Sequence, residues 1–106
     1  MILQIQPDQR AAAICSAWAQ YDRDCQQPPT AGLLEGVAGV FADGGMLSDH
    51  EVRWLMERVR WMQQRYYRTL ATAQAQSNPA LVAIMQQLVG EADYLHGRIA
   101  AAYDLE

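Results

Sequence analysis

Residues 48–76 read SDHEVRWLMERVRWMQQRYYRTLATAQAQ, and this stretch decides the fold. At about 100° per residue, a helix over these residues has an aliphatic side and an opposite side that carries two tryptophans. The aliphatic positions are Val52, Leu55, Met56, Val59, Met62, Tyr66 and Leu70. A helix with two such faces has to contact two surfaces, and the question is whether both belong to this chain.

Both ends of this helix are marked in the sequence. Ser48 and Glu51 have the spacing of a capping box, which satisfies free backbone N–H groups at a helix N-terminus. The helix ends near Gln76. The next helix begins directly afterwards, because Asn78 is a favourable N-cap and Pro79 fits the first turn of that next helix. The sequence therefore predicts helices over residues 48–76 and 79–104.

The second of these helices has the most regular apolar spacing in the chain. Successive apolar residues are four and then three positions apart, which places them on one side of the helix as a stripe. This stripe consists of Leu81, Met85, Leu88, Ala92, Leu95, Ile99 and Ala102. Because the two stripes match, the helices are expected to form an antiparallel hairpin with a coiled-coil-like seam, each helix about 38 Å long. The opposite side, with Ala83, Gly90 and Gly97, is either solvated or approached by a second backbone.

Two shorter helices are predicted before the hairpin, over residues 7–25 and 30–42, separated by the prolines of QQPPT. Their apolar faces are Ile14, Trp18, Tyr21 and Cys25 in the first and Leu33, Leu34, Val37, Val40 and Phe41 in the second. The glycines at 32, 36 and 39 suggest that another backbone comes close. Apart from a short extended segment over Ile2–Ile5, no strand pattern is present. We predict one all-α, four-helix domain over residues 1–106, built on the long hairpin with the two shorter helices packed against it.

The composition limits the class of protein. The chain has 106 residues, of which 51% are hydrophobic and 19% charged, as in a single folded domain. The N-terminus lacks the pattern of a secretory signal, and no apolar run is long enough for a membrane span. Cys15 and Cys25 lie in one predicted helix about 15 Å apart, too far for a disulfide. Free thiols suit a reducing compartment, so a cytoplasmic protein is expected.

No motif indicates catalysis, a metal or a cofactor. The segment DGGMLSDHE at residues 43–51 resembles a calcium loop superficially, but the early ligand positions, Val40, Ala42 and Gly44, offer no side-chain oxygen. Asp93 and His96 form only one Asp-x-x-His pair, whereas di-iron helical bundles use two Glu-x-x-His pairs and two further glutamates. Neither cysteine has the surroundings of an activated nucleophile, because Cys15 lies among alanines and an isoleucine and Cys25 lies near the acidic Asp22 and Asp24. We therefore expect no enzyme, no metal site and no cofactor.

The candidate binding residues lie on the second face of residues 48–76. They are Arg53, Trp54, Arg58, Arg60, Trp61, Arg65, Tyr67 and Arg68. All eight basic residues of the chain are arginine, which fits a general compositional bias, but five of them fall in this helix with only Glu57 between them. Trp, Tyr and Arg are also the residues that dominate protein interfaces. We expect the tryptophans to form a floor for the two N-terminal helices and the arginines to remain exposed beside them.

These features predict a non-catalytic protein-binding module, such as a small helical adaptor, chaperone or inhibitor, that presents arginines to an acidic protein partner. Compact acidic domains of this kind are common in phages and mobile elements, which is an analogy only. One alternative is a nucleic-acid binder that uses the arginine-rich helix, although the net charge of −4 opposes it. A structural homodimer or larger homo-oligomer is the second alternative.

Overall fold

The computed structural model describes the backbone of residues 2–103 and the side chains of residues 5–101. The elements run in the order β1 (Ile2–Ile5), α1 (Gln9–Asp24), α2 (Pro28–Asp43), β2 (Gly45–Ser48), α3 (Asp49–Ala75) and α4 (Pro79–Tyr103). The described chain is an all-α domain with four helices, as predicted; α3 packs on α4 in the predicted hairpin, and α1 packs on α2. Helix ends lie within two residues of the predicted ones, although residue 104, the predicted end of the last helix, is outside the described part.

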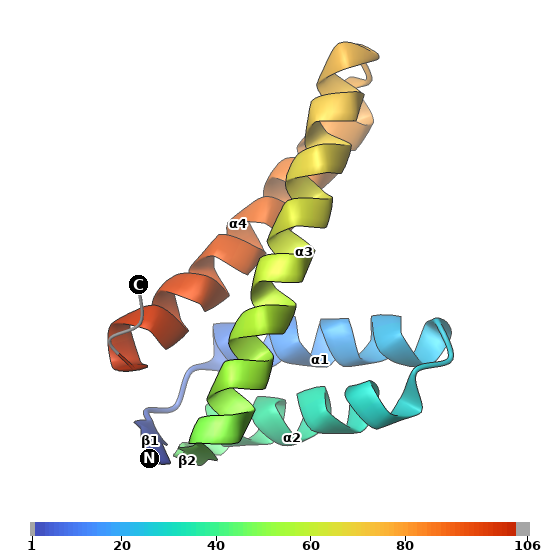
Figure 1. Cartoon of the computed structure of the whole chain (residues 1–106). Coiled ribbons are helices and arrows are strands. Elements are labelled where there is room, and N and C mark those ends of the chain that lie inside the picture. Colours follow the sequence, from blue (N-terminus) through green and yellow to red (C-terminus); the bar gives the residue numbers. More distant parts are fainter. Residues whose placement is uncertain (1, 104–106) are drawn as a thin grey trace.

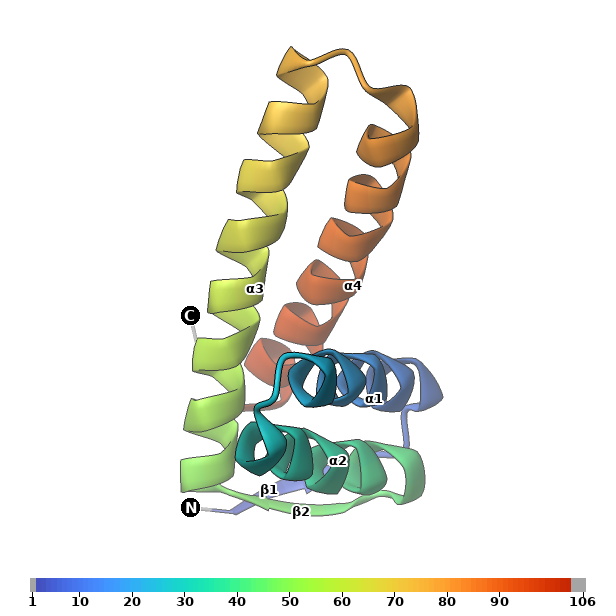
Figure 2. The same ribbon diagram turned by 90° about the vertical axis from the view of Figure 1, so that its right-hand side faces the viewer.

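The hairpin of α3 and α4 begins and turns where the sequence indicates. The Ser48 hydroxyl accepts a hydrogen bond from the Glu51 N–H at 3.2 Å, and the Glu51 carboxylate accepts one from the Ser48 N–H at 2.9 Å. At the turn, the Asn78 side chain accepts from the Leu81 N–H at 3.2 Å and so caps α4. The two helices then run antiparallel beside each other (Figure 2).

The α1–α2 pair lies across one end of this hairpin, and the other end projects beyond it (Figure 1). The main core cluster reaches up α3 as far as Tyr66 and along α4 only from Ala92 onward. We call this covered part the base, and we call residues 67–91 the tip. Only a few buried apolar side chains lie in the tip, namely those of Ala73, Met85 and Val89, and they are not part of the main cluster. The hairpin is therefore a core element at its base and a two-helix arm at its tip.

A small antiparallel sheet closes the bottom of the molecule. The extended segment Ile2–Ile5 is confirmed as strand β1, but its partner β2 was not predicted, because the sequence there reads as a glycine turn. Ile5 lies opposite Gly45 in the register. Gly44 has φ 78°, and a Cβ there would lie 3.1 Å from Pro7 Cδ. Glycine at this position thus lets the N-terminal segment lie against the α2–β2 connection.

Asp8 fastens the start of α1 to α4. One carboxylate oxygen accepts from the Ala11 N–H at 3.0 Å, which caps α1, and the other accepts from Tyr94 at 2.7 Å and Arg98 at 2.6 Å. Burial alone would raise the pKa of Asp8, but these donors and the Arg98 charge outweigh it and hold the pKa below 3.8. The carboxylate therefore favours this docked geometry.

Three predicted features of the shorter helices are wrong. The apolar stripe of α1 ends at Trp18, since Tyr21 and Cys25 are exposed and the charged Asp22 is buried instead. Figure 1 shows why: the C-terminal end of α1 extends past α3, where α2 is the helix that runs beside it. On α2, Leu33 is 47% exposed although the predicted face included it.

The third concerns the glycines at 32, 36 and 39, because a Cβ on any of them would meet no heavy atom within 4 Å. On α4, Ala83, Gly90 and Gly97 are likewise exposed, so no other segment of the described chain covers them. The side chain of Ala102 lies outside the described residues.

Candidate functional site

The two tryptophans of α3 have different environments. Trp54 is half-buried and packs against the main core, so it contributes to the predicted floor. Trp61 is 43% exposed, and for this residue the prediction of a buried floor is wrong. Near Trp61, α1 contacts α3 through the ion pair of Asp22 with Arg58 and not through apolar side chains. The Trp61 indole lies next to this ion pair and is not covered by it.

Two arginines hold the exposed indole of Trp61. The Arg58 guanidinium carbon lies 5.1 Å from the ring centroid, and that of Arg65 lies 4.7 Å from it. The two positions are one helical turn before and after the tryptophan, so the spacing of α3 itself creates this arrangement. Exposed cation–π contacts contribute about 0.5–1 kcal/mol each. The indole is thereby ordered without being covered.

Arg58 is also one partner of a buried ion pair. Its Nη2 contacts Asp22 Oδ1, and the side chains are 14% and 3% exposed. The Asp22 Oδ2 and Arg58 Nε atoms are buried and have no hydrogen-bond partner among the described residues. This arginine joins α3 to α1 inside the protein. The expectation that the Arg58 side chain remains exposed is therefore wrong, because it lies against a carboxylate that sequence periodicity assigns to the surface.

The remaining exposed groups beside Trp61 form one surface. We define the Trp61 surface as Tyr21, Cys25, Trp61 and Arg65, which surround a depression of about 390 Å³ at the end of α1. Tyr21 is 39% exposed, so two aromatic side chains from different helices face solvent here. Within the described part of the chain, Arg65 forms no ion pair with a carboxylate. The surface thus combines exposed aromatic area with one available positive charge.

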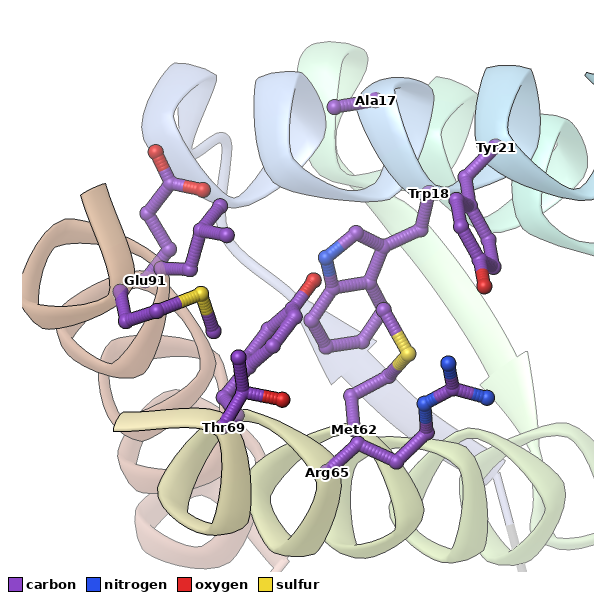
Figure 3. Close-up of a pocket in the computed structure, with 10 residues that line it drawn as sticks. Ala17, Trp18, Tyr21, Met62, Arg65, Thr69 and Glu91 are labelled. Atoms are coloured by element: carbon purple, nitrogen blue, oxygen red, sulfur yellow. The ribbon is translucent and has the colours of Figure 1, made fainter. Parts of the chain in front are cut away.

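A second cavity adjoins this surface in the corner between α1 and the hairpin. We call it the corner pocket; its volume is about 340 Å³, and it shares Tyr21 and Arg65 with the Trp61 surface. Figure 3 shows Arg65 and Glu91 at opposite ends, with the Trp18 indole and Met62 between them. Trp18 is 3% exposed, and its indole N–H has no hydrogen-bond acceptor among the described residues.

The other predicted residues lie elsewhere on α3. Arg53 pairs with Asp49 of the same helix at 2.8 Å, a carboxylate that the prediction had not matched to it. Arg60, Tyr67 and Arg68 line a separate, shallow depression that Asp93 of α4 also lines. There the Tyr67 hydroxyl donates to Asp93 at 2.7 Å, and this bond raises the pKa of Tyr67. The eight candidates are therefore not gathered around one depression of the surface.

Sequence reasoning missed the parts of the site that other helices supply. Tyr21 was assigned to the buried stripe of α1, since it follows Trp18 by three residues. Glu91 lies beside the apolar stripe of α4, directly before Ala92, and looks like an ordinary surface acid. No local signal indicates that α1 extends past α3, and this tertiary feature is what exposes Tyr21 and opens the corner pocket.

The described residues contain little that resembles a reactive centre. Cys15 and Cys25 are both free thiols, and burial raises the pKa of Cys15 to about 12, which keeps it protonated at neutral pH. Among the residues described, no three His, Cys, Asp or Glu side chains are grouped so that they could hold a metal ion. None of the described helices combines the length and hydrophobicity needed to cross a lipid bilayer.

Comparison with known proteins adds no family to this picture. No protein-family model, curated protein or solved structure matches the chain significantly.

Proposed function

We propose that this chain is a non-catalytic protein-binding module, a small helical adaptor, chaperone or inhibitor, whose contact area is the Trp61 surface. The observation that carries the proposal is the exposure of Trp61, which is 43% accessible although two guanidinium groups hold its ring. Tryptophan, tyrosine and arginine are the residues most enriched at the energetic centres of protein interfaces.

The order of this surface supports the proposal. Binding is weakened when flexible side chains have to be immobilised, at a cost of about 0.5–1.5 kcal/mol for each one. Here Trp61 is oriented before any partner arrives, because Arg58 is fixed by Asp22 and Arg65 stacks on the other side. An interface built on it starts from a partly ordered state.

The charge of the surface favours an acidic partner. Arg65 forms no ion pair within the described chain, whereas Arg23, Arg53, Arg58 and Arg98 are each matched to a carboxylate. A carboxylate of the partner can therefore bind Arg65 without displacing an internal one. Association should weaken as salt rises, since rim charges are screened.

The test compares two pairs of matched variants of the full chain. Trp61→Ser should remove most of the captured partner when the tagged protein is used as bait in an extract of its source cells. Tyr67→Ser is the control, because Tyr67 is similarly exposed, at 48%, but lines a different depression from the one beside Trp61. Arg65→Glu and Arg68→Glu form the second pair, of which only the first should lower capture. Equal capture by Trp61→Ser and Tyr67→Ser contradicts the proposal.

One observation also favours the alternative of nucleic-acid binding. An exposed indole between guanidinium groups is the kind of platform on which single-stranded bases stack. A fluorescently labelled oligonucleotide at about 50 mM salt tests this, because electrostatic binding is strongest at low salt. Oligonucleotide binding that disappears in both Trp61→Ser and Arg65→Glu would show that the partner is a nucleic acid and not a protein.

The homo-oligomer alternative rests on the exposed side chains of Leu33 and Ile84, and light scattering tests it by measuring the mass of the protein in solution.

A further inference from the structure

We infer that the corner pocket receives an apolar side chain from a peptide segment of the partner, and that an acidic residue next to it in the segment binds Arg65. This inference rests on the proposed function and specifies the chemistry of the partner. It starts from the position of the pocket, which opens where α1 leaves the hairpin and adjoins the Trp61 surface through Tyr21 and Arg65. A partner that covers Trp61 therefore also covers the mouth of the pocket.

The size and lining of the pocket suit one or two side chains. Its volume of about 340 Å³ lies at the lower end of the range for ligand sites, roughly 300–1,000 Å³. The walls are apolar, with Met62 and Met85 among them, and methionine adapts readily to the shape of an inserted group. Filling such a pocket with an aliphatic or aromatic side chain removes apolar surface from water on both molecules.

The pocket also contains a polar group that requires an acceptor. The Trp18 indole nitrogen is only a donor, is buried, and forms no hydrogen bond within the described residues. The Tyr66 hydroxyl is its neighbour, and its pKa is raised mainly by burial, with the indole N–H opposing the shift. These two groups nevertheless do not reach hydrogen-bond geometry. Because the indole nitrogen is fully covered, a backbone carbonyl of an inserted segment can accept from it only when the neighbouring Tyr66 side chain moves aside, and a purely apolar ligand cannot accept from it at all.

The two charged residues at the ends determine the kind of occupant. Arg65 lies at one end and Glu91 at the other, and neither is ion-paired within the described part of the chain (Figure 3). The occupant therefore needs an anionic group toward Arg65 and an N–H donor toward Glu91. A peptide segment supplies a carbonyl for Trp18, an N–H for Glu91 and an acidic side chain for Arg65, with the apolar side chain between them.

The test uses small peptides as probes and the Trp18 indole signal as the readout. The chain has three tryptophans, so an isotope-labelled sample shows three indole N–H resonances in solution NMR, and Trp18→Phe identifies the relevant one. Titration with acetyl-Asp-Leu-amide should shift the Trp18 signal downfield and saturate at millimolar peptide. The probe acetyl-Arg-Leu-amide should bind about tenfold more weakly, and acetyl-Asp-Ser-amide should not shift the Trp18 signal.

Matched variants locate the binding. Ala17→Phe fills the pocket from an exposed position of α1 and should abolish the shift, whereas Ala13→Phe, also exposed on α1 but outside the pocket, should not. Arg65→Gln should make acetyl-Asp-Leu-amide and acetyl-Asn-Leu-amide bind equally, and Arg68→Gln should preserve the preference for Asp.

Three results overturn the inference. They are the absence of a saturable shift of the Trp18 signal, an equal response in Ala17→Phe and Ala13→Phe, and equal binding of the Asp and Arg peptides. A Trp18 shift that depends on protein concentration without peptide also overturns it, because a second copy of the chain then occupies the pocket.

Failure of this inference can be distinguished from failure of the proposed function. If the peptides do not bind while Trp61→Ser still removes the partner, only the corner pocket loses its role. If the peptides bind as expected while Trp61→Ser and Tyr67→Ser capture the partner equally, the pocket remains and the Trp61 surface is wrong.

Discussion

The base and the tip of the hairpin are built from the same helices with the same apolar repeat, yet they are stabilised differently. In the base, Leu55, Val59 and Leu95 are fully buried because α1, α2 and the small sheet cover them. In the tip, Leu70 and Leu81 are only half-buried, and Ile84 is 56% exposed. The comparison shows that a regular stripe predicts which helices pair, while the surrounding helices decide how much of the pair becomes core.

The candidate site lies on the boundary between these regions. The corner pocket is lined by Trp18 and Met62 from the base and by Met85 and Leu88 from the tip. Because local opening is easiest where few apolar contacts are buried, amide hydrogens of the tip should exchange faster than those of the base. The site thus combines a rigid side, where Trp61 is held, with a side that can adjust to a ligand.

The largest expected effect concerns the ion pair that joins α1 to the base of α3. Arg58→Ala leaves Asp22 buried without its partner, and we expect a loss of about 3–5 kcal/mol in the free energy of unfolding. Urea denaturation followed by circular dichroism measures it. The double variant Asp22→Leu with Arg58→Met should recover most of the loss, since apolar pairs often replace buried ions without cost. A loss below about 1 kcal/mol would show that α1 is held mainly by other contacts.

A matched pair of leucine substitutions tests the comparison directly. Leu55→Ala in the base should cost about 3 kcal/mol, because it leaves a cavity among fully buried side chains. Leu81→Ala in the tip should cost about 1 kcal/mol, since that side chain is only half-buried. Urea unfolding of both variants, with unchanged dependence on denaturant, measures the difference. Equal costs would mean that the tip is as much a part of the cooperative core as the base.

The sequence predicts the helices well because their end signals are local. Ser48 with Glu51 and Asn78 with Pro79 act through bonds within one turn, and each one stands where the structure places a helix end. The pairing of α3 with α4 is also local information, since both stripes can be read from spacing alone. Strand β2 could not be predicted, because its partner β1 lies some forty residues earlier and its first residue, Gly45, is the second of two consecutive glycines.

The candidate site is predictable only in part, for a related reason. The spacing of Arg58, Trp61 and Arg65 is visible in the sequence, and their stacking follows from helix geometry. Which of the arginines is used internally depends on Asp22, a charged residue of α1 that no periodicity places in the core. The exposure of Trp61 and Tyr21 depends on where α1 crosses α3, and that crossing is a property of the whole fold.

Asp8 makes part of the stability of the base depend on pH. Its pKa is lowered in the folded state, so its contribution is complete above the unfolded pKa, near 4, and is lost as pH falls through the lower folded value. Asp8→Asn keeps an N-cap but removes the charge, and it should cost about 1 kcal/mol at neutral pH, because Arg98 is 35% exposed and partly screened. Unfolding at several pH values should show the difference between the two proteins shrinking as the pH falls below the unfolded pKa, near 4. A difference that stays constant at every acid pH at which the protein still folds would show that the charge of Asp8 is not what fastens α1 to α4.

The smallest expected effect is a gain in stability, and it tests whether the base and the tip open independently. Gly36→Ala adds a methyl group where nothing lies within 4 Å, so it should stabilise the protein by about 0.5–1 kcal/mol through lower entropy of the unfolded chain. Gly44→Ala is the opposite control, because φ is 78° and Pro7 lies 3.1 Å from the added Cβ, and it should destabilise. If the tip opens independently, Gly36→Ala slows amide exchange in α1 and α2 but leaves the exchange of residues 70–84 unchanged. Slower exchange in both regions would mean instead that the tip opens only when the whole domain unfolds, and the adjustable side of the corner pocket would then be as rigid as its base.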